Sequence, residues 1–222
     1  MSRLQIAPSI LAADFANLAD AVSAVAAATD TLHVDVMDGH FVPNLSIGPP
    51  VVQALRGVTP LHLDCHLMMT NPAQYLGAFK KAGADSCTVH VEIGATRDLI
   101  QQMRDLGLGV GLALNPDRTF ADVAPFLADI DMLLVMSVFP GFGGQSFIAD
   151  VLDTVKAARA EIDRGGLATV IQIDGGIDAH TIVSAAAAGA TNFVAGTAVF
   201  GKPDPALAVE ELRNAAQGAL AA

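Results

Sequence analysis

The segment HVDVM, residues 33–37, carries the clearest fold signal in the chain. Alternate residues of a strand share a face, so His33, Asp35 and Met37 lie on one side and the two valines between them on the other. The valine face suits packing against helices. The opposite face places polar groups inside the protein, where they need partners.

Short β-branched runs of this kind recur along the whole chain, at residues 4–7, 32–36, 61–67, 87–91, 110–114, 132–138, 169–173 and 192–195. Ala-rich segments with helical spacing lie between them, at residues 15–28, 96–106, 147–162, 179–188 and 205–220. Several helices are expected to end at a glycine that the next strand follows at once, as at Gly83, Gly107 and Gly189. The alternation predicts an α/β fold with eight parallel strands, a (β/α)8 TIM barrel. An open doubly wound sheet is the alternative.

Composition favours one compact domain over residues 1–222, since 52% of the residues are hydrophobic and 16% are charged. Residues 38–50, rich in Gly, Pro and Asn, are longer than a connector needs to be and are expected to form a lid or a subunit contact. Two cysteines are too few for a disulfide framework, and there is no signal peptide or bilayer-spanning run of about 20 apolar residues. We therefore expect a cytoplasmic protein without a membrane partner.

The net charge of −11, with only 12 Lys plus Arg, argues against a nucleic-acid partner because no basic stripe is present. The same balance constrains any phosphate-bearing substrate. Its phosphate would be held by backbone N–H groups and helix N-termini rather than by an arginine clamp.

Polar residues interrupt three predicted strands at inward-facing positions. His66 in LDCHLM and Asp174 in VIQID match His33 and Asp35 in this respect. A buried carboxylate without a partner costs several kcal/mol. Two imidazoles and two carboxylates predict a site for one divalent metal, Zn²⁺ or else Fe²⁺, Mn²⁺ or Co²⁺. A hydrogen-bonded polar core without metal is the alternative.

Glycine-rich turns follow the last three predicted strands. They contain Gly141, Gly143 and Gly144, then Gly175 and Gly176, then Gly196 with Thr197. Glycines let backbone N–H groups approach an anion closely, and barrels often bind phosphate in the loops after their last strands. The turns predict one phosphate site; the alternative is a flexible loop with ordinary turn glycines.

Other inward-facing residues have simpler interpretations. Met37, Met68 and Met136 are expected to pack in the core or to form an apolar wall that keeps water from a reactive intermediate. His90 and Glu92, on the fourth strand, are expected to pack or to contact substrate rather than to bind metal.

Six motifs between Ile6 and Gly201 resemble the ribulose-phosphate 3-epimerase family: IAPSILAADF, HVDVMDGHFVPN, LDCHLM, PGFGGQSF, IDGGI and VAGTAVFG. The resemblance covers nearly the whole chain and implies a barrel of the ribulose-phosphate-binding type. It implies that His33, Asp35, His66 and Asp174 bind the metal and that the two aspartates are the catalytic acid/base pair. It also implies a homo-oligomer.

The resemblance further implies substrate contacts from Ser9, His66, Gly141, Phe142, Gly143, Gly144, Asp174, Gly175, Gly176, Gly196 and Thr197. Two positions depart from the family pattern. Phe139 stands where a polar residue is frequent, which would alter loop packing near the substrate. Thr197 replaces a common serine and keeps its hydroxyl.

The activity that the resemblance implies is the interconversion of D-ribulose 5-phosphate and D-xylulose 5-phosphate, in the pentose phosphate pathway and the Calvin cycle. One carboxylate would remove the C3 proton of this phosphorylated ketopentose to give a metal-stabilised enediolate, and the second acid would return a proton to the opposite face.

Three alternative functions stay open. The same chemistry could act on a ketohexose phosphate such as allulose 6-phosphate. A lyase on a related barrel would need an active-site lysine, and none of the assigned inner strand positions carries one. A non-catalytic sugar-phosphate-binding protein would have no use for two acids.

Overall fold

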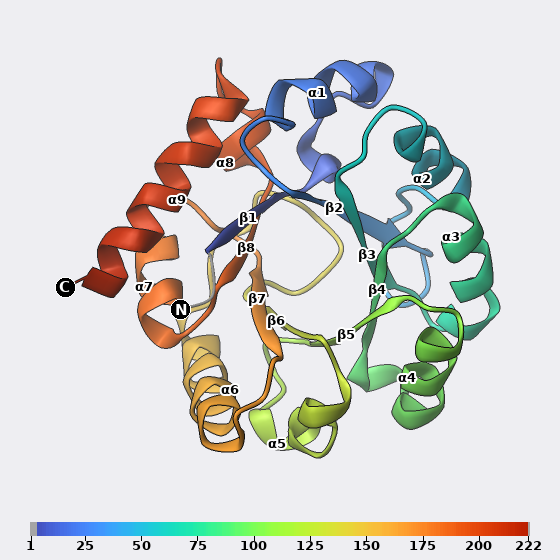
Figure 1. The fold of residues 1–222 in the computed structure, drawn as a ribbon, viewed down its shortest axis with the longest axis vertical. Coiled ribbons are helices and arrows are strands. Elements are labelled where there is room, and N and C mark those ends of the chain that lie inside the picture. The colour runs from blue at the N-terminus through green and yellow to red at the C-terminus, as the bar shows by residue number, and fades with distance from the viewer. Residues whose placement is uncertain (1–3, 222) are drawn as a thin grey trace.

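Eight strands alternate with helices in the computed structural model, which describes residues 4–221 (Figure 1). The strands are β1 (Gln5–Pro8), β2 (Thr31–Met37), β3 (His62–Met68), β4 (Ser86–His90), β5 (Gly109–Leu114), β6 (Met132–Met136), β7 (Val170–Asp174) and β8 (Asn192–Ala195). The α-helices are α1 (Leu18–Val25), α2 (Pro49–Arg56), α3 (Leu76–Ala82), α4 (Thr96–Asp105), α5 (Phe120–Val123), α6 (Leu152–Gly165), α7 (Thr181–Ala188), α8 (Thr197–Phe200) and α9 (Pro205–Ala221). Short 3-10 helices are η1 (Ile10–Ala12), η2 (Phe15–Asn17), η3 (Pro72–Gln74), η4 (Val91–Ile93), η5 (Ala124–Asp129) and η6 (Ala149–Val151).

The strands form one parallel sheet in the order β1-β8-β7-β6-β5-β4-β3-β2. Its first and last strands meet through a parallel bridge between Ser9 and His33, so the sheet curls into a nearly closed barrel. Figure 1 shows the helices as an outer ring around the strands. The predicted (β/α)8 barrel is confirmed, and the open doubly wound sheet is wrong.

The main hydrophobic core lies between the strands and the helices. Leu67, Leu112, Ile173 and Phe193 point outward from their strands and are fully buried in it. The barrel interior is different, because polar residues of β2, β3, β4 and β7 share it with methionines and small side chains. Apolar packing outside thus holds polar groups inside.

Strand register decides which polar residues become neighbours. In the β2–β3 pair, His33 lies opposite Asp64 and Asp35 lies opposite His66. In the β3–β4 pair, His66 lies opposite Thr88. The register therefore gathers histidines and carboxylates on adjacent strands.

The helices differ from the sequence expectation in extent. The helix expected at residues 15–28 is divided into η2 and α1, and residues 147 and 148 precede the helical turns of η6 and α6. Four α-helices that the sequence did not single out, α2, α3, α5 and α8, have only 8, 7, 4 and 4 residues. Such short helices span about two turns or fewer and give little periodic signal.

Within residues 4–221, no helix combines the length and the apolar character that crossing a bilayer requires.

Replacing Leu112 by alanine should lower the free energy of unfolding by about 2–5 kcal/mol, because its side chain is fully buried and would leave a cavity. Urea denaturation measures the change. Leu45→Ala is the matched control, since this leucine is 73% exposed and should change stability by less than about 0.5 kcal/mol. Equal effects of the two substitutions would contradict this account of the core.

Candidate functional site

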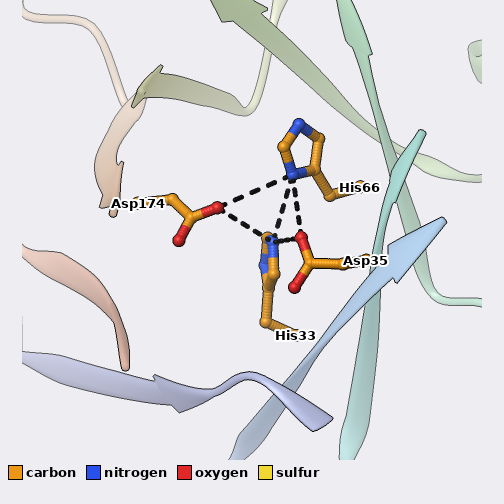
Figure 2. Close-up of side chains that lie close together, drawn as sticks. All are labelled: His33, Asp35, His66 and Asp174. Atoms are coloured by element: carbon orange, nitrogen blue, oxygen red, sulfur yellow. Dashed lines mark hydrogen bonds and ion pairs between the residues drawn. The ribbon is translucent and has the colours of Figure 1, made fainter. Parts of the chain in front are cut away.

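Four titratable side chains meet at the carboxyl ends of three strands, as Figure 2 shows. His33 and Asp35 come from β2, His66 comes from β3, and Asp174 is the last residue of β7. The structure brings together all four residues that strand parity placed on inner faces.

The spacing of their ligand atoms suits one metal ion, since all four atoms lie within 4.8 Å of one another. His33 Nε2 lies 3.3 Å from Asp35 Oδ1 and 3.9 Å from Asp174 Oδ2. His66 Nδ1 lies 3.2 and 3.8 Å from the same two oxygens and 3.4 Å from His33 Nε2. Ligands about 2.1 Å from a tetrahedral ion are roughly 3.4 Å apart. These residues could therefore hold one divalent ion.

Burial and neighbouring charges separate the two carboxyl groups. Burial opposes ionisation of Asp35, but His33 and His66 outweigh it and hold the pKa of Asp35 well below its usual range. Burial, with the negative charge of Asp35, raises the pKa of Asp174 to about 7. One carboxyl group is thus ionised near neutral pH while the other can carry a proton.

The two histidines also differ. Burial opposes a charge on His33, but Asp35 and Asp64 outweigh it, so the pKa of His33 lies well above its usual range. Burial lowers the pKa of His66. Both rings are completely buried.

Asp64 supports His33 from behind. Its Oδ2 lies 3.1 Å from His33 Nδ1 and accepts a hydrogen bond of 3.0 Å from Gln172 Nε2. Its Oδ1 accepts from the Ser86 hydroxyl at 2.9 Å. A carboxylate bonded to the far nitrogen of a ligand histidine orients the ring and increases its basicity.

His90 and Glu92 lie behind His66. His90 Nε2 lies 2.8 Å from His66 Nε2, and His90 Nδ1 lies 3.2 Å from Glu92 Oε2. Burial lowers the pKa of His90 to about 4, so its ring is neutral at pH 7. Neither His90 nor Glu92 lines the large cavity above the barrel.

Asp35 is fixed from two directions. The Ser9 hydroxyl donates to Asp35 Oδ2 at 2.5 Å. The Ser46 hydroxyl donates to the Asp35 carbonyl oxygen at 2.6 Å and accepts from the Met37 backbone N–H at 3.0 Å. The carboxylate and the strand that carries it are therefore both held in place.

A cavity of about 990 Å³ opens above this cluster at the carboxyl ends of the strands. The predicted site residues on its wall are Ser9, Asp35, Met37, Met68, Met136, Gly141, Phe142, Gly143, Gly144, Asp174, Gly175, Gly176, Gly196 and Thr197. His33 and His66 lie beneath it and do not line it, so a substrate contact by His66 stays a prediction.

Two of the glycines leave no room for a side chain. Gly175 has φ of +121°, and a Cβ there would lie 2.8 Å from the Val138 backbone nitrogen. Gly176 has φ of +61°, and a Cβ there would lie 2.7 Å from the Phe147 backbone nitrogen. The β7 turn therefore packs directly against the backbone of the loop after β6.

Sequence reasoning missed the supporting roles of Asp64, His90 and Glu92, although all three share the inward parity of their strands. It also missed Lys202, which lines the cavity but belongs to no polar pattern. Phe139 is 52% exposed and does not line the cavity.

A parallel barrel with a polar cavity at the carboxyl ends of its strands defines a (β/α)8-barrel enzyme. The sequence profile of the ribulose-phosphate 3-epimerase family matches residues 5–200. The chain belongs to this family.

Curated relatives carry the same family name. The ribulose-phosphate 3-epimerase of Mycobacterium tuberculosis is 51% identical over 219 residues, covering 96% of this chain and 93% of the relative. That of Bacillus subtilis is 43% identical over 214 residues, covering 95% and 99%. The rice relative, named a cytoplasmic isoform, is 43% identical over 220 residues, covering 96% and 95%.

Solved structures of other barrel enzymes share the fold at low identity. 3-Hexulose-6-phosphate synthase from Salmonella typhimurium has a TM-score of 0.71 at 17% identity, covering 97% of this chain and 100% of that one. KGPDC from Streptococcus mutans, solved in complex with a phosphorylated pentose, has a TM-score of 0.75 at 14% identity, covering 97% and 98%. These likenesses concern the fold.

The raised pKa of Asp174 gives metal-free protein a testable pH dependence. Between the unfolded value of about 3.9 and the folded value of about 7, the native state binds a proton that the unfolded state has released. This contribution to stability is complete below the lower value and is lost as the pH rises through the upper one. Asp174→Asn should therefore stabilise the metal-free protein more at pH 8 than at pH 5, as measured by urea denaturation.

Asp153→Asn is the control, because the Asp153 side chain is 85% exposed. Its effect should be the same at both pH values. A pH-independent effect of Asp174→Asn would contradict the assigned shift.

Proposed function

We propose that the protein interconverts D-ribulose 5-phosphate and D-xylulose 5-phosphate by moving a proton at C3, with Asp35 and Asp174 as the two acid/base groups. One observation carries the proposal. Two carboxyl groups from β2 and β7, with opposite pKa shifts, line the same cavity beside a set of metal-ligand atoms.

Inversion at C3 requires proton removal from one face of the sugar and proton delivery to the other. An ionised carboxylate serves as the base and a protonated carboxyl group as the acid. The opposite pKa shifts of Asp35 and Asp174 supply one group in each state, and the two exchange roles when the reaction runs backward.

We propose His33, Asp35, His66 and Asp174 as the ligands of one divalent cation, Zn²⁺, Fe²⁺, Mn²⁺ or Co²⁺. Its positive charge would stabilise the negative charge that develops on the sugar oxygens as the C3 proton leaves. The Ser9 hydroxyl and the buried histidines orient Asp35, so that it meets the substrate in one conformation.

The glycine-rich side of the cavity is the proposed phosphate site. Its members are Gly141, Phe142, Gly143, Gly144, Gly175, Gly176, Gly196 and Thr197. Backbone N–H groups in such turns bind phosphate without a charged side chain. The Streptococcus mutans barrel, solved with a phosphorylated pentose, supports a sugar phosphate as the ligand of this architecture.

Met37, Met68 and Met136 are proposed as the apolar wall that keeps water from the carbanion-like intermediate. All three line the cavity, and each is at least 95% buried. We also propose a homo-oligomer in the cytoplasm, consistent with the name of the rice relative.

Removal of the metal should abolish turnover. A coupled assay follows D-xylulose 5-phosphate formation from D-ribulose 5-phosphate before and after chelation, then with each of the four metals restored. We expect chelation to stop the reaction and at least one metal to restore it. Unchanged activity after complete metal loss would refute the metal's role, whereas a preference for a ketohexose phosphate would refute the proposed substrate.

A two-acid mechanism also predicts distinct behaviour of the single variants. Asp35→Asn and Asp174→Asn should each lower epimerisation about 10²–10⁴-fold or more, because one proton transfer loses its group. In deuterated water, each variant should still exchange the C3 proton of one epimer, and the two variants should differ in which epimer exchanges. Metal content is measured for both. Full epimerisation in either metal-loaded variant would overturn the assignment.

A further inference from the structure

The His66 ring is held at both of its nitrogens. Nδ1 faces the proposed metal ligands, whereas Nε2 lies 2.8 Å from His90 Nε2. The contact continues from His90 Nδ1 to Glu92 Oε2 at 3.2 Å. Glu92 Oε1 in turn accepts from the Asn115 backbone N–H at 2.7 Å.

This arrangement determines which nitrogen of each ring carries hydrogen. An ionised carboxylate only accepts hydrogen bonds, so His90 Nδ1 must donate to Glu92. In a neutral ring the other nitrogen then accepts, and His66 Nε2 must donate to it. The lone pair of His66 is therefore on Nδ1, which faces His33, Asp35 and Asp174.

We propose that His90 and Glu92 are positioning residues that lock His66 in the tautomer and orientation needed to bind the metal through Nδ1. The inference rests on the metal site under the proposed function and deepens it. Neither residue lines the cavity, so they act through His66 rather than on the substrate.

The packing around His90 supports an orienting role. His90 is 1% exposed, and its ring stacks on that of His66 with centroids 5.0 Å apart and planes 21° apart. The Phe41 ring covers it with a centroid distance of 4.6 Å. These contacts leave His90 in one orientation, aimed at His66.

The two ligand histidines are supported by different means. His33 bonds directly to the Asp64 carboxylate, whereas His66 reaches the Glu92 carboxylate through a second imidazole. A leucine at position 90 would leave the His66 N–H unpaired in a buried place and would remove the bias toward the Nδ1 lone pair.

The test compares Zn²⁺ affinity of the full-length protein with that of three variants, by competition with a chromogenic chelator. His90→Leu removes the acceptor, and His90→Gln keeps an acceptor oxygen near the same place. Glu92→Gln removes the charge at the end of the chain. Cys87→Ala is the matched control, because Cys87 is buried on the same strand but packs in the outer core.

We expect His90→Leu to weaken Zn²⁺ binding about 10–100-fold. His90→Gln should stay within a few-fold of the unaltered protein, Glu92→Gln should fall between the two histidine variants, and Cys87→Ala should bind normally. The visible spectrum of the Co²⁺-loaded protein, which reports ligand geometry, should change in His90→Leu and be preserved in His90→Gln.

Two results would overturn the inference. Unaltered Zn²⁺ affinity in a folded His90→Leu protein would show that His66 needs no such support. Equal weakening by His90→Leu, His90→Gln and Cys87→Ala, matched by equal losses of stability in urea, would reveal a general packing effect. Failure of the unaltered protein itself to bind any of the four metals would instead refute the proposed function and the inference with it.

Discussion

The mutual compensation of buried charges is the constraint on which this structure depends. His33, Asp35 and His66 are at most 5% exposed, in an environment where an uncompensated charge costs several kcal/mol. Each therefore has partners, Asp64 for His33 and the Ser9 hydroxyl for Asp35. A divalent ion would complete the compensation, because its two positive charges would match two ionised aspartates.

The parallel barrel makes this compensation attainable. Its strands bring their carboxyl ends to one rim, and the outward-facing residues, such as Leu67 and Phe193, supply the apolar burial that stabilises the whole. Polar residues inside can then be selected for chemistry. The raised pKa of Asp174 and the lowered pKa of Asp35 follow from these different surroundings.

Strand parity alone was enough to predict that His33, Asp35, His66 and Asp174 share an interior, and the alternation of elements was enough to predict the barrel. The sequence could not predict which nitrogen of each histidine faces the cluster. That depends on register between strands, which places Asp64 beside His33, and on packing between distant segments. The same limit applies to His90, whose parity is visible in the sequence but whose contact with His66 is not.

The long segment at residues 38–50 is explained by what it joins. Ser46 braces the end of β2 on both sides of Asp35, and Phe41 covers His90. Asn44 Nδ2 donates to the carbonyl oxygen of Gly141 at 2.8 Å, which links this segment to the glycine-rich loop after β6. A shorter connector could not reach all three places. One segment thus ties the proposed metal site to the proposed phosphate site, because displacement of either end would strain the other.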